Sequence, residues 1–164
     1  MCKGLSSLHS SCLEKAKGIR MKLGYLVEKQ ELPHRQRSQD EMILQNLETL
    51  LSSEVGLKAF RCFLCSEFSE ENLEFWLACK DYRSTADSQL GAKAQGIYSQ
   101  FINSQAPQEV NLDSETRGAI VQVLEDPRAD AFDKAQQYIY TLMAKDSFPR
   151  FLRSSYFQQV LKTL

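Results

Sequence analysis

Four glutamates precede the most apolar stretch of this 164-residue chain, and closely spaced carboxylates are candidate acid and base groups. No partner motif accompanies them, because the sequence has no phosphate-binding glycine loop, no HExxH and no nucleophile elbow. Acidic residues in a first helical turn also offset the positive end of the helix dipole. We therefore interpret the four glutamates as the acidic N-terminal region of a helix. We expect a protein that is not an enzyme itself and needs no cofactor. The four are Glu67, Glu70, Glu71 and Glu74.

Cys62 and Cys65 form a CxxC, a spacing used by zinc and redox sites. A second such pair is missing, His9 and His34 lie far away in sequence, and the pair sits inside the apolar run LKAFRCFLCSEF rather than in a tight turn. Five cysteines without paired spacing also argue against a disulfide framework and favour a reducing compartment. We predict two thiols on one helix and no metal site.

Composition indicates one domain with a basic appendage. The chain is 43% apolar and carries a net charge of −1. Residues 1–40 hold eight Lys/Arg against four Asp/Glu, whereas residues 41–164 hold twelve against seventeen. An acidic domain with dispersed basic residues is a poor nucleic-acid binder. We find neither a run of about 18 apolar residues nor a secretory signal, and we expect a cytoplasmic protein.

The basic head divides from the domain at a polar linker. Residues 1–30 show apolar residues at helical spacing with lysine and arginine on the other side. Such a helix either docks on the domain or lies on an anionic bilayer, and its excess of positive charge favours the membrane. Cys2 and Cys12 are candidate acylation positions, with unmodified thiols as the alternative. Residues 31–40 contain Pro33 and lack periodicity, so the domain is expected at residues 41–164.

Helical runs separated by short polar breaks fill the domain. They span residues 41–53, 54–68, 70–82, 92–103, 114–125 and 131–145, followed by a short turn broken near Pro149 and a last helix. Ser69, Asp113 and Asp130 are placed to cap three of these runs. Strand alternation is absent from the sequence pattern, which predicts an all-α fold. The stripe of Leu73, Trp76 and Leu77 is expected in its core.

Three ordered blocks carry a resemblance to a known family. SEENLEFWLACKDY resembles the signature helix of the regulators of G-protein signalling (RGS), and EVNLD followed by DSFPRFLRSSYF resembles later blocks of that family. The match covers about residues 44–161. The head resembles that of the small family members, which have little besides an amphipathic basic helix and the RGS domain.

The resemblance implies a bundle of about nine helices, in which a four-helix bundle packs against a subdomain made from both ends of the domain. It also implies a GTPase-activating protein that ends G-protein-coupled receptor signalling. The expected partners are heterotrimeric G-protein α subunits of the Gi class, the Gq class or both, in the GTP-bound or transition-state form. With residues 1–30 on an anionic surface, the expected location is the inner face of the plasma membrane.

Contact positions follow from the resemblance in three segments that would form one face. Asn111 is expected to reach the glutamine and the attacking water of the partner, and the alternative is that its side chain only closes its own loop. An i,i+4 ion pair is expected between Asp146 and Arg150, either as an orienting pair or as an ordinary surface pair. The positions are Glu67, Phe68, Ser69, Glu71, Asn72, Asn111, Leu142, Asp146, Ser147 and Arg150.

Three positions qualify the resemblance. Phe68 stands where many relatives have tyrosine, and Pro149 removes a backbone donor beside Arg150. Cys79 matches a reported acylation position, so palmitate there is a candidate, yet its place in a packed helix favours a buried thiol. The rival functions are a non-catalytic helical scaffold and a membrane-surface adaptor in which the head is the active part.

Overall fold

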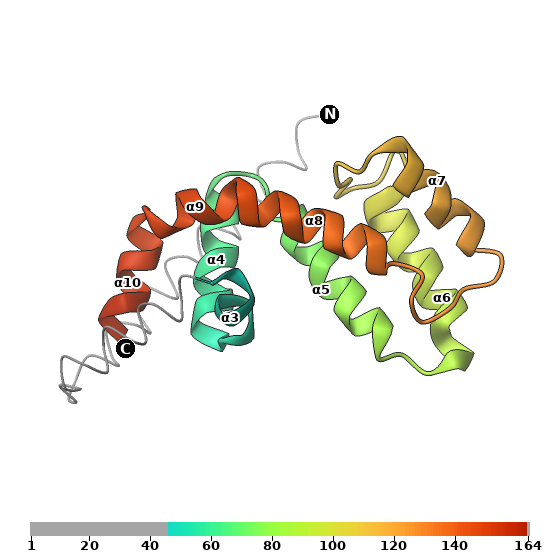
Figure 1. Ribbon diagram of the computed structural model, residues 1–164, viewed down its shortest axis with the longest axis horizontal. Helices are drawn as coiled ribbons and strands as arrows, with labels where there is room; N and C mark the ends of the chain where they lie inside the picture. Colours follow the sequence, from blue (N-terminus) through green and yellow to red (C-terminus); the bar gives the residue numbers. More distant parts are fainter. Residues whose placement is uncertain (1–45, 164) are drawn as a thin grey trace. The chain divides into compact units, whose positions relative to one another are not determined.

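The computed structural model describes residues 46–163, and every regular element in that range is helical (Figure 1). This confirms the predicted all-α class for the described range. The predicted head 1–30 with Cys2 and Cys12, the linker 31–40, and residues 41–45 of the predicted domain lie outside the described residues. None of the helices described between residues 46 and 163 is long and apolar enough to span a bilayer.

The helices form two compact units. The first, which we call the terminal unit, joins the described residues 46–69 to residues 146–163, and the second, the central unit, is Glu70–Lys145. A subdomain made from both ends of the domain is thus confirmed, and the other unit contains four α-helices. The terminal unit holds α3 (Leu47–Ser52), α4 (Glu54–Ser66), α9 (Ser147–Leu152) and α10 (Ser155–Thr163). The central unit holds α5 (Glu71–Arg83), α6 (Asp87–Ile97), the π-helical segment η1 (Tyr98–Ile102), α7 (Ser114–Val123) and α8 (Asp133–Lys145).

Aromatic side chains fill the core of the terminal unit. Phe151 on α9 is fully buried, and its ring lies edge-on to Phe60 and Phe63 of α4, with centroid distances of 5.2 and 5.6 Å. Phe157 of α10 contacts the same ring at 5.5 Å. Edge-to-face pairs at these distances stabilise beyond the area they bury. Phe151 thereby fixes α4 against the C-terminal helices.

The core of the central unit is organised around α5. Tyr82 lies edge-on to Phe132 at 4.8 Å, and its hydroxyl donates to the backbone carbonyl of Arg128 at 2.8 Å. Leu73 is fully buried as predicted, but Trp76 and Leu77 are only half-buried. The Trp76 ring instead sits against Tyr140 of α8 at 6.5 Å, with the Lys80 ammonium 5.7 Å from its centroid. The predicted stripe is therefore partly a surface feature.

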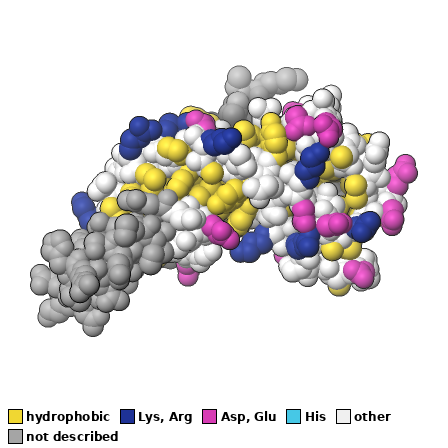
Figure 2. All heavy atoms as spheres, in the orientation of Figure 1, with side chains coloured by type: hydrophobic (Ala, Val, Ile, Leu, Met, Phe, Trp, Pro, Cys, Tyr) yellow, Lys and Arg dark blue, Asp and Glu magenta, His cyan; other side chains and the backbone are white. Residues whose placement is uncertain are grey.

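Side-chain charges are mixed on the visible face of the central unit. On the part of Figure 2 that belongs to the central unit, acidic and basic side chains alternate rather than gather by sign. A nucleic-acid site requires a clustered basic patch. The visible face of this unit offers none.

Two of the three predicted caps are wrong. Asp113 caps α7 as predicted, because its Oδ1 accepts the Thr116 N–H at 2.8 Å. Ser69 does not cap α5, which has Glu70 at its N-cap position and begins at Glu71, since the Ser69 N–H is turned back onto α4. Asp130 lies in a turn at residues 129–132 that precedes the start of α8.

Two other boundaries differ from the sequence pattern. Pro149 does not break the C-terminal region, because it is the third residue of α9, where backbone N–H groups have no partner within the helix. The run predicted at residues 92–103 changes after Ile97 into the π-helical η1, which ends with the Asn103 N–H donating to the Tyr98 carbonyl at 2.9 Å. Periodicity near 3.6 residues does not resolve such a change.

Gly56 marks a close approach between α3 and α4. A Cβ at this position would lie 2.6 Å from the Leu50 carbonyl oxygen and 2.7 Å from Leu50 Cδ1. We expect Gly56→Ala to lower the free energy of unfolding by about 1–3 kcal/mol through overpacking. Gly118→Ala on α7 is the matched control, because a Cβ there meets nothing within 4 Å.

The control should instead raise the free energy of unfolding by about 0.5–1 kcal/mol, since alanine favours a helix over glycine. Urea unfolding of both variants measures the two effects. If Gly56→Ala is as stabilising as Gly118→Ala, the close contact between α3 and α4 is absent in solution.

Candidate functional site

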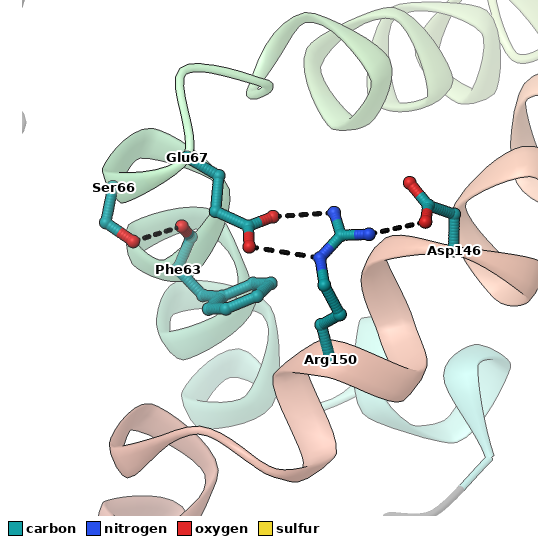
Figure 3. A network of polar contacts seen from close by, with 5 residues as sticks. All are labelled: Phe63, Ser66, Glu67, Asp146 and Arg150. Carbon is teal, nitrogen blue, oxygen red and sulfur yellow. Dashed lines mark hydrogen bonds and ion pairs between the residues drawn. The ribbon is translucent and has the colours of Figure 1, made fainter.

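An arginine with two carboxylate partners joins the end of α4 to α9 in the terminal unit (Figure 3). Arg150 Nε and Nη2 donate to the two carboxylate oxygens of Glu67 at 3.1 and 2.8 Å, and Nη1 pairs with Asp146. The predicted pair of Asp146 and Arg150 is thus confirmed. Both hydrogen-bonded carboxylates raise the pKa of Arg150. Glu67 is the stronger partner, because a two-pronged carboxylate fixes the plane of the guanidinium.

This network presents charge to solvent. The side chains of Glu67, Arg150 and Asp146 are 29%, 41% and 74% exposed. Exposed ion pairs contribute at most about 1 kcal/mol to stability, so the network's main effect is to fix the side chains in one geometry. It forms an oriented polar surface that a partner protein can meet without ordering the side chains again.

The turn after α4 holds Phe68 in a left-handed conformation. Its φ is 57°, and no other non-glycine residue among those described has a positive φ. The Ser69 N–H donates to the Leu64 carbonyl at 3.0 Å, and the Phe68 N–H donates to the Cys65 carbonyl at 3.2 Å. These two bonds make a Schellman motif, in which the position of Phe68 is usually glycine. The aromatic ring is nevertheless kept there and is 66% exposed.

Two predicted contact residues begin α5 in the central unit. Glu71 and Asn72 occupy its first turn and are half-buried. Burial raises the pKa of Glu71, with a smaller contribution from the nearby Glu70 charge. A carboxyl with a raised pKa makes folding less favourable as pH rises through its titration. Ionisation of Glu71 therefore lowers the stability of the fold.

Asn111 lies in the loop between η1 and α7, near its C-terminal end. It is exposed, whereas its neighbours Val110 and Leu112 are 1% and 7% exposed. The Leu112 N–H donates to the Val110 carbonyl at 3.1 Å, which closes a γ-turn with Asn111 at its centre. The side chain thus points outward from a loop that is anchored on both sides. Within the described residues the Asn111 side chain makes no hydrogen bond that would close the loop.

The anchor on the α7 side is the Asp113 cap. Its carboxylate accepts from both the Thr116 N–H and the Thr116 hydroxyl at 2.8 Å. These bonds lower the pKa of Asp113. The capped α7 starts three residues after Asn111, so the helix and the turn are fixed together.

The remaining predicted contacts are more enclosed. Leu142 on α8 is half-buried, and Ser147 at the start of α9 is 6% exposed. The described structure brings together Glu67, Asp146 and Arg150 within the terminal unit, while Glu71, Asn72, Asn111 and Leu142 belong to the central unit. That all ten form one face stays a prediction.

The three described cysteines lie on helices and form no disulfide. Cys62 and Cys79 are buried and Cys65 is half-buried, which confirms the prediction of two thiols on one helix for the CxxC. Burial raises the pKa of Cys79, so its reactive thiolate is disfavoured. Among residues 46–163, no group of three or more His, Cys, Asp or Glu is placed to hold a metal ion.

Sequence reasoning passed over Arg117. Its guanidinium donates to the backbone carbonyls of Ile102, where the loop that carries Asn111 begins, and, at 3.1 Å, of Val110, which directly precedes Asn111. A signal was available, because Arg117 lies in the first turns of α7, where the helix dipole disfavours a cation. An arginine at a position that the helix dipole disfavours indicates that its side chain has a specific partner elsewhere.

Comparison with known proteins places the described residues in one family. Residues 46–160 match the model described as "Regulator of G protein signaling domain". The chain is 43% identical to "Regulator of G-protein signaling 5" of Sus scrofa, over 99% of this chain and 100% of that one. It is 50% identical to "Regulator of G-protein signaling 21" of Homo sapiens, over 73% of this chain and 79% of the relative. It is 48% identical to "Regulator of G-protein signaling 1" of Homo sapiens, over 73% of this chain and 57% of the relative.

The left-handed Phe68 allows a test of strain at the site. We expect Phe68→Gly to raise the free energy of unfolding by roughly 0.5–1 kcal/mol, because glycine adopts a positive φ without the Cβ clash but is more flexible when unfolded. Phe68→Ala is the matched control, since it removes the ring and keeps the clash. Urea unfolding of the two variants separates these contributions. A Phe68→Gly variant that is less stable than Phe68→Ala would mean that the turn carries no strain.

Proposed function

The chain belongs to the regulator of G-protein signaling family, and we propose that it acts as a GTPase-activating protein for heterotrimeric G-protein α subunits. Membership makes it a regulator of G-protein signalling. The proposal adds a biochemical activity: the domain binds the switch segments of the GTP-loaded α subunit and shortens the lifetime of its active state.

The observation that carries the proposal is the setting of Asn111. An asparagine offers both a donor and an acceptor, and here it is exposed at the centre of a γ-turn between two buried residues. A polar side chain on such a rigid support meets a partner without first being ordered. We assign it the contact with the glutamine and the attacking water of the α subunit.

The mechanism needs no catalytic group from this chain. An α subunit already carries the arginine that stabilises the transition state and a glutamine that orients the attacking water. A bound partner accelerates the reaction if it binds the aligned arrangement of these groups more tightly than the ground state. A hundredfold acceleration requires about 2.7 kcal/mol of such preference.

The remaining side chains would supply the binding surface. Glu67 and Arg150 hold each other in a fixed geometry, and Phe68 offers an exposed ring beside them. Glu71 and Asn72 add polar groups at the start of α5. We propose that these residues contact the switch segments of Gi-class or Gq-class α subunits, together with Ser69, Leu142, Asp146 and Ser147.

The head would bring the domain to its substrate. We propose that residues 1–30 bind the anionic inner face of the plasma membrane, with Cys2 and Cys12 as acylation positions. The support is the basic amphipathic pattern of this segment. Cys79 is a weaker candidate, because its thiol is 2% exposed. Activity in solution should not require the head.

Single-turnover GTP hydrolysis by a purified Gi-class α subunit tests the proposal. Residues 39–164 should accelerate hydrolysis, and Asn111→Ala should reduce the acceleration by about tenfold or more, because removal of one transition-state hydrogen-bonding group from an enzyme costs roughly a hundredfold to a thousandfold in rate. Asn103→Ala is the matched control, because this exposed asparagine belongs to the same loop and its Oδ1 accepts only from its local neighbours Ser104 and Gln105. It should keep the wild-type rate.

Three results separate the alternatives. A domain that binds the α subunit but changes no rate, with either the Gi or the Gq class, is a scaffold. Activity that disappears when residues 1–38 are removed identifies the head as the active part. Equal loss in Asn111→Ala and Asn103→Ala would keep the activity but remove the assigned role of Asn111.

A further inference from the structure

We propose that Arg117 is a positioning residue, whose guanidinium holds the γ-turn that presents Asn111. The inference deepens the proposed function and rests on it. Arg117 is not a contact residue in this account, because its side chain is 27% exposed and all its recorded partners lie within the central unit.

The guanidinium holds together two parts of the chain that no helix joins. Nη1 donates to the Ile102 carbonyl at the end of η1, and Nη2 donates to the Val110 carbonyl at 3.1 Å. Nη2 also lies 3.2 Å from the Glu109 carboxylate. Ile102 and Val110 are buried, so their carbonyls lie where few other donors can reach them. Arginine suits this position because its planar fork supplies several donors in fixed directions.

The Val110 carbonyl couples Arg117 to Asn111. This oxygen accepts from Arg117 Nη2 and also from the Leu112 N–H that closes the γ-turn. The Val110 N–H donates in turn to the Phe101 carbonyl at 2.9 Å. Residue 110 is thus held through both of its backbone polar groups. A shift of its carbonyl changes the peptide plane that precedes Asn111 and redirects the asparagine side chain.

The other end of the turn is held by α7 itself. The Arg117 N–H donates to the Asp113 carbonyl at 3.0 Å, while the Asp113 carboxylate caps the helix through Thr116. The start of α7 therefore fixes the loop on both sides of Asn111. The Asp113 cap follows Asn111, and the Arg117 side chain holds Val110, the residue before it. The loop between Ile102 and Asp113 is closed by this one residue at both of its ends.

The test separates positioning from stability. Single-turnover GTP hydrolysis by a Gi-class α subunit is measured over a range of concentrations of residues 39–164, for the wild type and for Arg117→Met. We expect the maximal stimulated rate to fall by about tenfold or more, because small misplacements of an acting group have large effects on rate. The half-saturating concentration should change by less than about threefold, since the binding surface supplied by the terminal unit is intact.

Two further variants make the outcome specific. Arg83→Met is the matched control, because it removes an arginine of the same unit whose recorded partner is Asp133, far from the loop in sequence. It should keep the wild-type maximal rate. Arg117→Lys keeps the charge and most of the stem but offers its donors from one nitrogen, so it should recover the urea midpoint more fully than the maximal rate.

Coupling to Asn111 is measured in the double variant. If Arg117 acts through Asn111, Arg117→Met should lower the rate little further in an Asn111→Ala background. Hydrogen exchange of the Leu112 amide gives a second readout without any G protein, and Arg117→Met should speed it by about tenfold.

Each outcome decides the inference. A wild-type maximal rate in a folded Arg117→Met or Arg117→Lys variant overturns it, and so do fully additive effects with Asn111→Ala. If Arg117→Met fails to fold, the rate and urea midpoint of Arg117→Lys decide. If the wild-type domain accelerates no α subunit, the proposed function fails, and the Leu112 exchange then decides only whether Arg117 fixes the loop.

Discussion

The packing of Phe151 against α4 is the interaction on which the architecture depends. It joins α9 to α4, and in doing so it brings Arg150 within hydrogen-bonding distance of Glu67, a residue 83 positions earlier. Loop closure of that length is entropically unfavourable, and exposed ion pairs do not offset it. Burial of the aromatic rings supplies most of the free energy that offsets this loop closure. The polar network forms as a consequence of that packing. Substitutions at Phe151 would therefore affect the Glu67–Arg150 network without touching either residue.

Features that do not favour stability gather in the short segment Glu67–Asn72, which comprises the turn after α4 and the first two residues of α5. Phe68 is held at a positive φ, the Ser69 hydroxyl is buried without a hydrogen-bond partner among the described residues, and burial raises the pKa of Glu71. Each would be readily improved by substitution if stability alone mattered. Strain and incomplete polar pairing concentrate at functional sites in proteins. The same segment contains half of the predicted contact residues, and it directly follows α4.

Local patterns in the sequence predicted what local physics determines. The Asp113 cap and the Asp146–Arg150 pair involve residues three or four positions apart, and both are present. Ser69 looked equally suitable as a cap, but its N–H completes the Schellman motif of the preceding helix, so the next helix begins later. The bond of Glu67 to Arg150 and the fork of Arg117 depend on tertiary packing, which no spacing in the sequence reveals. The family resemblance supplied Asn111, and only the structure showed how its loop is held.

The central claim is that the domain prefers the transition-state arrangement of an α subunit. Its affinity can be measured directly by titrating residues 39–164 into one Gi-class α subunit bound either to GDP with aluminium fluoride, which mimics the transition state, or to a non-hydrolysable GTP analogue. The account predicts clearly tighter binding to the aluminium fluoride form, because only differential affinity accelerates the reaction. Equal affinity for the two forms would contradict it and leave a binding module without activity.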